Sequence, residues 1–130
     1  MIRSVGEKLG GLLTYRGGEG QWSYTLHRLT GIGVFVFLLA HIVDTAFIMI
    51  GPEAYNGMVN LYRHPFFRTG EVALFGAVLF HSLNGVRVAI VDLTVNGTLW
   101  QKKLFWGEVI LFVLLMIPSV YIMMKPVWFP

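Results

Sequence analysis

The chain has 130 residues, of which 55% are hydrophobic and only 13% are charged, and its net charge is +3. Ordinary soluble domains carry about 25% charged residues, so this composition cannot cover a water-exposed surface and fits a protein whose solvent is lipid. No dense run of lysine and arginine is present, which argues against nucleic-acid binding. The absence of cysteine excludes disulfides, thiolate-ligated iron–sulfur clusters and covalently attached c-type haem.

Three apolar segments, at about 29–50, 72–91 and 104–124, dominate the sequence. Each has the roughly 20 residues that an α-helix needs to cross a hydrocarbon core of about 30 Å. We therefore predict an all-α integral membrane protein, with three transmembrane helices in an antiparallel bundle and one membrane-anchor domain over residues 1–130. Three helices leave an inward polar stripe with few partners, so we expect a partner subunit to complete the bundle.

The distribution of cations predicts the orientation in the membrane. Three cations fall on one side of the predicted spans, and seven fall on the other; they are Arg63, Arg68 and Lys125 against Arg3, Lys8, Arg16, Arg28, Arg87, Lys102 and Lys103. The positive-inside rule then places the N-terminus in the cytoplasm and the C-terminus outside. The first 20 residues lack the apolar core of a signal peptide, so we expect direct, multi-pass insertion into a bacterial inner membrane.

Ionisable side chains inside a span cost about 2.5–3.5 kcal/mol each on insertion scales, so each is a functional candidate. His81 lies in the middle of the second span, with Gly85 one helical turn later on the same face. A neutral imidazole is a good axial ligand for haem iron, and a glycine leaves room for a flat macrocycle. Arg87, about 9 Å nearer the cytoplasm, suits a haem propionate or a surface acid. The simpler alternative is a histidine that hydrogen-bonds between helices.

Two further histidines lie in or near the first span. His27 and Arg28 form a cationic pair at its entrance, which suits propionates or a quinone carbonyl, or ordinary anchoring at the membrane surface. His41 lies deeper, three residues before Asp44. If Arg28 and Arg87 share one interface, His41 lies about 10 Å farther out than His81, too far to share its iron. His41 is then either the ligand of a second, outer haem or a structural or proton-handling residue beside Asp44.

Two segments resemble the cytochrome b subunit of succinate:quinone oxidoreductase, respiratory complex II. Residues 26–31 (LHRLTG) are similar to that family's His-Arg-x-Ser/Thr-Gly signature, and residues 81–87 (HSLNGVR), followed by Asp92, are similar to its His-x-x-x-Gly-x-Arg segment. The spacing of the two segments, the chain length and the three spans also match. The resemblance therefore covers nearly the whole chain.

The resemblance implies a role for each matching residue. It makes His81 the axial ligand of haem b and the metal ligand, with the second ligand supplied by a partner anchor subunit. It places Arg28 near the quinone, with His27 and Arg87 near the haem propionates. A family serine is replaced here by Tyr24. The neighbouring candidates for quinone contact are Trp22, Ser23 and Tyr24. His41 resembles the outer-haem ligand of members with two haems.

The resemblance also implies a function and partners. The chain would anchor a succinate dehydrogenase and pass electrons to menaquinone or ubiquinone, and both succinate oxidation and fumarate reduction fit. A flavoprotein subunit and an iron–sulfur subunit would carry the remaining chemistry, so this chain alone holds no complete active site and no catalytic residue. Two alternatives are an unrelated cytochrome b with two histidine ligands and a haem-free anchor or transporter subunit.

Overall fold

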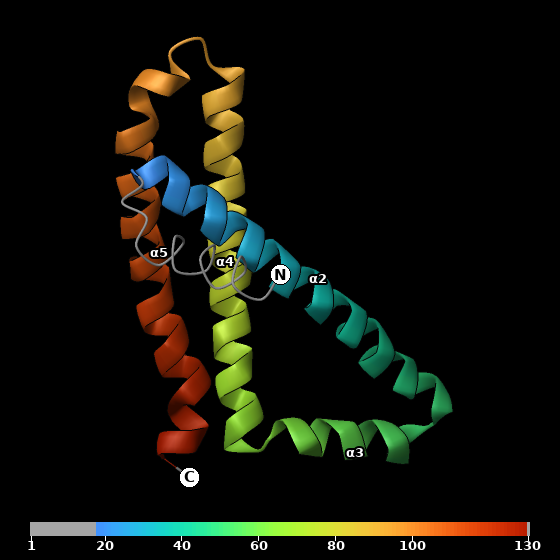
Figure 1. Cartoon of the computed structure of the whole chain (residues 1–130). Helices are drawn as coiled ribbons and strands as arrows, with labels where there is room; N and C mark the ends of the chain where they lie inside the picture. Colours follow the sequence, from blue (N-terminus) through green and yellow to red (C-terminus); the bar gives the residue numbers. More distant parts are fainter. Residues whose placement is uncertain (1–17, 130) are drawn as a thin grey trace, which may run out of the picture.

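The computed structural model describes residues 18–129, and in this range it contains four α-helices and no strand (Figure 1). They are α2 (Glu19–Ile50), α3 (Pro52–Tyr62), α4 (Pro65–Leu93) and α5 (Gly97–Trp128). Helices α2, α4 and α5 are each long and apolar enough to cross a membrane, which confirms the all-α membrane prediction. The N-terminal cations Arg3, Lys8 and Arg16, and the segment tested for a signal peptide up to residue 17, lie outside the described residues.

The long helices extend beyond the spans expected from hydropathy. Helix α2 begins at Glu19, about ten residues before the expected span, and contains 32 residues. At 1.5 Å per residue it is about 48 Å long, which exceeds a hydrocarbon core of about 30 Å. The excess length places the first turns of α2 at the level of the headgroups or requires the helix to tilt.

Glycine and proline set the helix boundaries. Gly51 has φ 143°, a left-handed conformation that L side chains rarely adopt, and it ends α2 immediately before Pro52 begins α3. Pro65 begins α4 in the same way, and the side chain of His64 caps that helix by accepting a hydrogen bond of 3.3 Å from the backbone N–H of Phe66.

Helix α3 was not expected from the sequence. It has 11 residues, and it runs from the end of α2 to the start of α4, so that the three helices form a triangle (Figure 1). Helices α4 and α5 lie side by side and antiparallel, whereas α2 crosses them obliquely with its first half and then diverges. The two halves of α2 therefore have different surroundings.

The interior of the described chain is polar. None of its apolar side chains is buried, and the buried side chains are Ser23, Asn84, Arg87 and Glu108. Soluble proteins show the opposite pattern, with aliphatic cores and solvated charges. The exposed apolar faces of the long helices thus require lipid or partner subunits to cover them.

Candidate functional site

Two histidines meet where α2 crosses α4. The rings of His27 and His81 stack with centroids 4.0 Å apart and planes 10° apart. The Nδ1 atom of His81 lies 3.1 Å from the backbone carbonyl oxygen of His27 and 3.4 Å from the hydroxyl of Thr30. Because a carbonyl oxygen can only accept, we assign the proton of His81 to Nδ1, which leaves Nε2 as the basic nitrogen.

Glycines allow this close approach of α2 to α4. A Cβ atom at Gly31 would lie 2.9 Å from Cε1 of His81, a distance that real Cβ contacts do not show. A Cβ atom at Gly85 would lie 3.7 Å from Cε1 of His27, which is an ordinary contact. Gly31 therefore makes the space for the His81 ring, and Gly85 faces the His27 ring.

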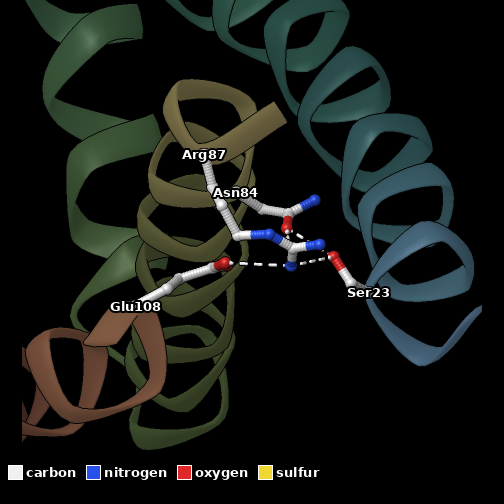
Figure 2. Close-up of polar contacts among 4 residues, drawn as sticks. All are labelled: Ser23, Asn84, Arg87 and Glu108. Atoms are coloured by element: carbon white, nitrogen blue, oxygen red, sulfur yellow. Dashed lines mark hydrogen bonds and ion pairs between the residues drawn. The ribbon is translucent and has the colours of Figure 1, made fainter. Parts of the chain in front are cut away.

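Four buried polar residues join the three long helices one turn away, and we call them the polar clasp: Ser23 of α2, Asn84 and Arg87 of α4, and Glu108 of α5 (Figure 2). The Ser23 hydroxyl donates to Asn84 Oδ1 at 2.5 Å. Nη1 of Arg87 donates to Ser23 Oγ at 2.7 Å and to Asn84 Oδ1 at 3.1 Å, and it lies 3.4 Å from Glu108 Oε2.

Breaking the contacts of the clasp is energetically costly. Separating a buried ion pair by removing one partner typically costs about 3–5 kcal/mol, because the remaining charge is left unpaired. Arg87 and Glu108 are 7% and 5% exposed, so this argument applies to them. Three buried atoms of the clasp, Asn84 Nδ2, Arg87 Nε and Glu108 Oε1, have no hydrogen-bond partner among the described residues and retain bonding capacity.

The other candidates for a quinone site are exposed side chains of α2. Nη1 of Arg28 donates to the hydroxyl oxygen of Tyr24 at 3.0 Å, and both side chains are exposed. Trp22 is likewise 50% exposed. Ser23, by contrast, is buried and engaged in the clasp. No sequence signal identified Glu108 as the partner of Arg87 or placed Ser23 in a buried cluster, because these contacts depend on how the helices face one another.

The contacts between α2 and α4 place Arg28 and Arg87 at different levels along the two helices. Ser23 contacts Arg87, and His27 contacts His81, so Arg28, five residues after Ser23, lies more than one turn along α2 from the contact with Arg87. His41 follows His27 by fourteen residues, about 21 Å along α2. The separation of His41 from His81 is consequently larger than the sequence indicated, and the two side chains occupy different places in the structure.

His41 lines a large cavity between the diverging half of α2, helix α3 and the start of α4, and we call it the outer cavity because it lies away from the clasp. The cavity has a volume of about 940 Å³, and its walls are mainly aromatic and aliphatic. The His41 ring stacks on Phe37 with centroids 5.4 Å apart. Asp44 accepts a hydrogen bond from the hydroxyl of Tyr62, and this bond raises the pKa of Tyr62. Asp44 is therefore paired with α3.

Within residues 18–129, no group of three or more His, Cys, Asp and Glu side chains could hold a metal ion. A metal bound at His81 would thus need ligands from outside the described part of the chain. A haem would need only one or two side-chain ligands from protein, because its porphyrin supplies the other four.

Comparison with known proteins places the chain in a family. Residues 7–121 match the family described as succinate dehydrogenase/fumarate reductase transmembrane subunit. The succinate dehydrogenase 2 membrane subunit SdhC of Mycobacterium tuberculosis is 39% identical over 105 residues, which cover 81% of this chain and 77% of that protein. The succinate dehydrogenase hydrophobic membrane anchor subunit of Halobacterium salinarum is 32% identical over 102 residues, 78% of each chain. The chain belongs to the family of succinate dehydrogenase/fumarate reductase transmembrane subunits.

Proposed function

We propose that this chain is the haem b-holding, quinone-site-forming membrane anchor subunit of a succinate dehydrogenase. Its partners are a second anchor subunit, an iron–sulfur subunit and a flavoprotein subunit in a bacterial inner membrane. The family and the names of the two relatives support the anchor role. The observation that carries the haem assignment is the His81 ring, whose Nδ1 is held by the carbonyl of His27.

The residues around His81 fit a haem b. A hydrogen bond from Nδ1 to a carbonyl fixes the tautomer and makes Nε2 the better ligand, as is usual for metal-binding histidines. His27 Nδ1 and Arg87 Nε are buried without a partner in the described residues, so both can bond to propionates. Within this proposal, the partner anchor subunit would supply the second iron ligand. When bound, the haem supplies a one-electron carrier between the iron–sulfur clusters and the quinone.

The exposed pair of Arg28 and Tyr24 is the proposed quinone site. The Tyr24 oxygen accepts from Arg28, so its own O–H is free to donate to a quinone carbonyl, and the guanidinium stabilises the negative charge that develops on that oxygen. Trp22 offers a flat surface beside this pair, whereas Ser23 is occupied in the clasp. Reduction to quinol takes two electrons from the partner subunits and two protons, which reach this side of the membrane from the cytoplasm.

This assignment retains the predicted orientation. The start of α2 lies toward the same end of the molecule as the connection between α4 and α5, and α3 lies at the opposite end with the C-terminal end of α5 (Figure 1). In this proposal the first end faces the cytoplasm and the second end faces outside. The outer cavity beside His41 is the candidate place for a second haem, since pockets for cofactors typically measure about 300–1,000 Å³. The number of haems per flavin distinguishes the two cases. One haem is expected if only His81 holds a haem, and two are expected if the outer cavity holds a second.

The test compares purified complexes that contain the wild-type chain, His81→Ala or His64→Ala. His64 is the matched control, because it is an exposed histidine that caps α4 at the opposite end. We expect a low-spin b-type signal in the wild type and in His64→Ala, and loss or conversion to high spin of one haem in His81→Ala. An unchanged low-spin haem content in His81→Ala would remove His81 from the ligand role and overturn the haem assignment.

A further inference from the structure

The contacts between α2 and α4 form two rungs of an antiparallel ladder. In the first rung, Ser23 contacts Asn84 and Arg87. In the second rung, His27 contacts His81. Ser23 and His27 are four residues apart, so they lie on the same face of α2, about 6 Å apart along its axis. A shift or rotation at the first rung is therefore transmitted to the second.

Apolar packing cannot fix this ladder by itself. No apolar side chain is buried in residues 18–129, and lipid tails are as apolar as the helix faces, so there is no hydrophobic preference for one register. The exposed ion pair between Glu19 and Lys102, at 3.3 Å, ties the first turn of α2 to α5 only weakly, because Lys102 is 74% exposed. The buried pair of Arg87 and Glu108 is the stronger constraint.

Glu108 governs the clasp because it supplies the charge opposite Arg87. Nη1 of Arg87 reaches Ser23, Asn84 and Glu108 at once, so the carboxylate both orients the guanidinium and neutralises it (Figure 2). Without that carboxylate, Arg87 becomes an unpaired buried cation, which turns toward water or another anion. Ser23 would then lose its donor from α4.

We propose that Glu108 is a positioning residue for the haem ligand: through Arg87 and Ser23 it fixes the register of α2 on α4, and so sets the orientation of the His81 ring. The proposal rests on the proposed function only where it refers to haem. The register itself involves groups of this chain alone and can be measured without the cofactor.

The first measurement is a zero-length crosslink in the membrane-bound complex. A carbodiimide activates the Glu19 carboxylate, which forms an amide bond with Lys102 Nζ and releases the reagent as its urea; mass spectrometry identifies the joined peptides. Four chains are compared: the wild type, Glu108→Gln, the double variant Arg87→Gln/Glu108→Gln, and Glu53→Gln. Glu53 is the matched control, because it is an exposed carboxylate in the first turn of α3.

The second measurement characterises the purified complexes themselves. It records the low-spin electron paramagnetic resonance signal of the haem, which depends on the orientation of the axial ligand, and the KM and kcat for a short-chain quinone. All values are normalised to flavin, so that a variant that assembles poorly is compared only through its assembled fraction.

We expect the crosslink yield to fall roughly fivefold or more in Glu108→Gln, and to return to within about twofold of the wild type in the double variant, because no unpaired charge remains there. The haem signal should shift and the quinone KM should rise in Glu108→Gln, while Glu53→Gln matches the wild type. A wild type without the crosslink would overturn the inference. A Glu108→Gln complex with a wild-type crosslink, or with a wild-type haem signal and KM, would also overturn it.

The two proposals fail separately. A wild-type complex that lacks a b-type haem refutes the haem assignment, and the crosslink together with the quinone KM then decides the role of Glu108. A wild-type complex with haem whose properties are insensitive to Glu108→Gln refutes the positioning role and leaves the ligand assignment to His81→Ala.

Discussion

Replacing Gly31 by alanine tests the placement of His81, the proposed haem ligand, against α2. The added Cβ atom would lie 2.9 Å from Cε1 of His81, whereas carbon atoms in contact prefer about 3.5–4.0 Å. The ring must therefore withdraw by about 0.6–1.1 Å. The nearby hydrogen bond from Nδ1 to the carbonyl of His27 is 3.1 Å long, and a movement of this size away from α2 would break it.

The expected change in stability is small although the geometric change is not. Loss of one hydrogen bond costs about 0.5–1.5 kcal/mol. Replacement of a helical glycine by alanine contributes about 0.5–1 kcal/mol in the opposite direction. The two effects nearly cancel, so the Gly31→Ala complex should assemble. Its haem signal should nevertheless change, because the ring has moved and has lost the acceptor that fixes its tautomer.

Gly33→Ala is the matched control. Gly33 lies on the same helix two residues later, and a Cβ atom there meets nothing within 4 Å among the described residues. We expect Gly33→Ala to retain the wild-type haem spectrum with equal or slightly higher thermal stability. The assay is the reduced-minus-oxidised spectrum and the low-spin resonance of each purified complex. Identical haem content and resonance in Gly31→Ala and Gly33→Ala would refute the contact between Gly31 and His81 as a determinant of the proposed haem site.

Three further predictions concern other parts of the structure. Arg28→Leu should lower kcat/KM for the quinone about tenfold or more, because a charge-assisted hydrogen bond is worth about 1.5–3 kcal/mol, while haem content per flavin stays constant; loss of haem with normal quinone reduction would contradict the assignment. Tyr62→Phe should lower the free energy of unfolding by about 0.5–1 kcal/mol at neutral pH, as measured by thermal unfolding. The bond to Asp44 raises the pKa of Tyr62 in the folded chain, so the wild type should lose this advantage only above a pH of about 10, the pKa of tyrosine in the unfolded chain. Gly97→Ala should strongly reduce the amount of chain in the membrane by immunoblot, since its Cβ would lie 2.3 Å from the Val91 carbonyl oxygen, whereas Gly107→Ala, in open space, should not.

Hydropathy predicted the three long helices because the bilayer imposes one requirement, about 20 apolar residues with every backbone group bonded internally. Helix α3 was missed because no comparable requirement acts on it. It has 11 residues of mixed polarity with Gly57 in its interior, so neither length nor composition distinguishes it from a loop. Its position depends on tertiary contacts, chiefly the hydrogen bond between Tyr62 and Asp44, which are 18 positions apart in the sequence.

The relative level of Arg28 and Arg87 could not be read from the sequence for a related reason. Helix α2 starts about ten residues before the apolar segment, and it crosses α4 obliquely, so an apolar boundary does not mark the depth of Arg28. The pairing of Arg87 with Glu108 likewise depends on how α4 and α5 are rotated about their axes. Sequence separation within a single helix defines a face, but it does not define which residue of another helix meets that face.

The distribution of polar contacts has a consequence for how this subunit can be held in a complex. In the described chain, the buried clasp and the stacked histidines join the first half of α2 to α4 and α5, so that half is fixed from within the subunit. The second half diverges around the outer cavity and is tied back through α3, where the bond between Tyr62 and Asp44 joins the two helices. Its exposed faces are apolar, and lipid gives such faces no reason to adopt one orientation. Variants of the clasp should therefore alter the proposed haem and quinone region even in the assembled complex, whereas variants of Tyr62 should act mainly on the second half of α2.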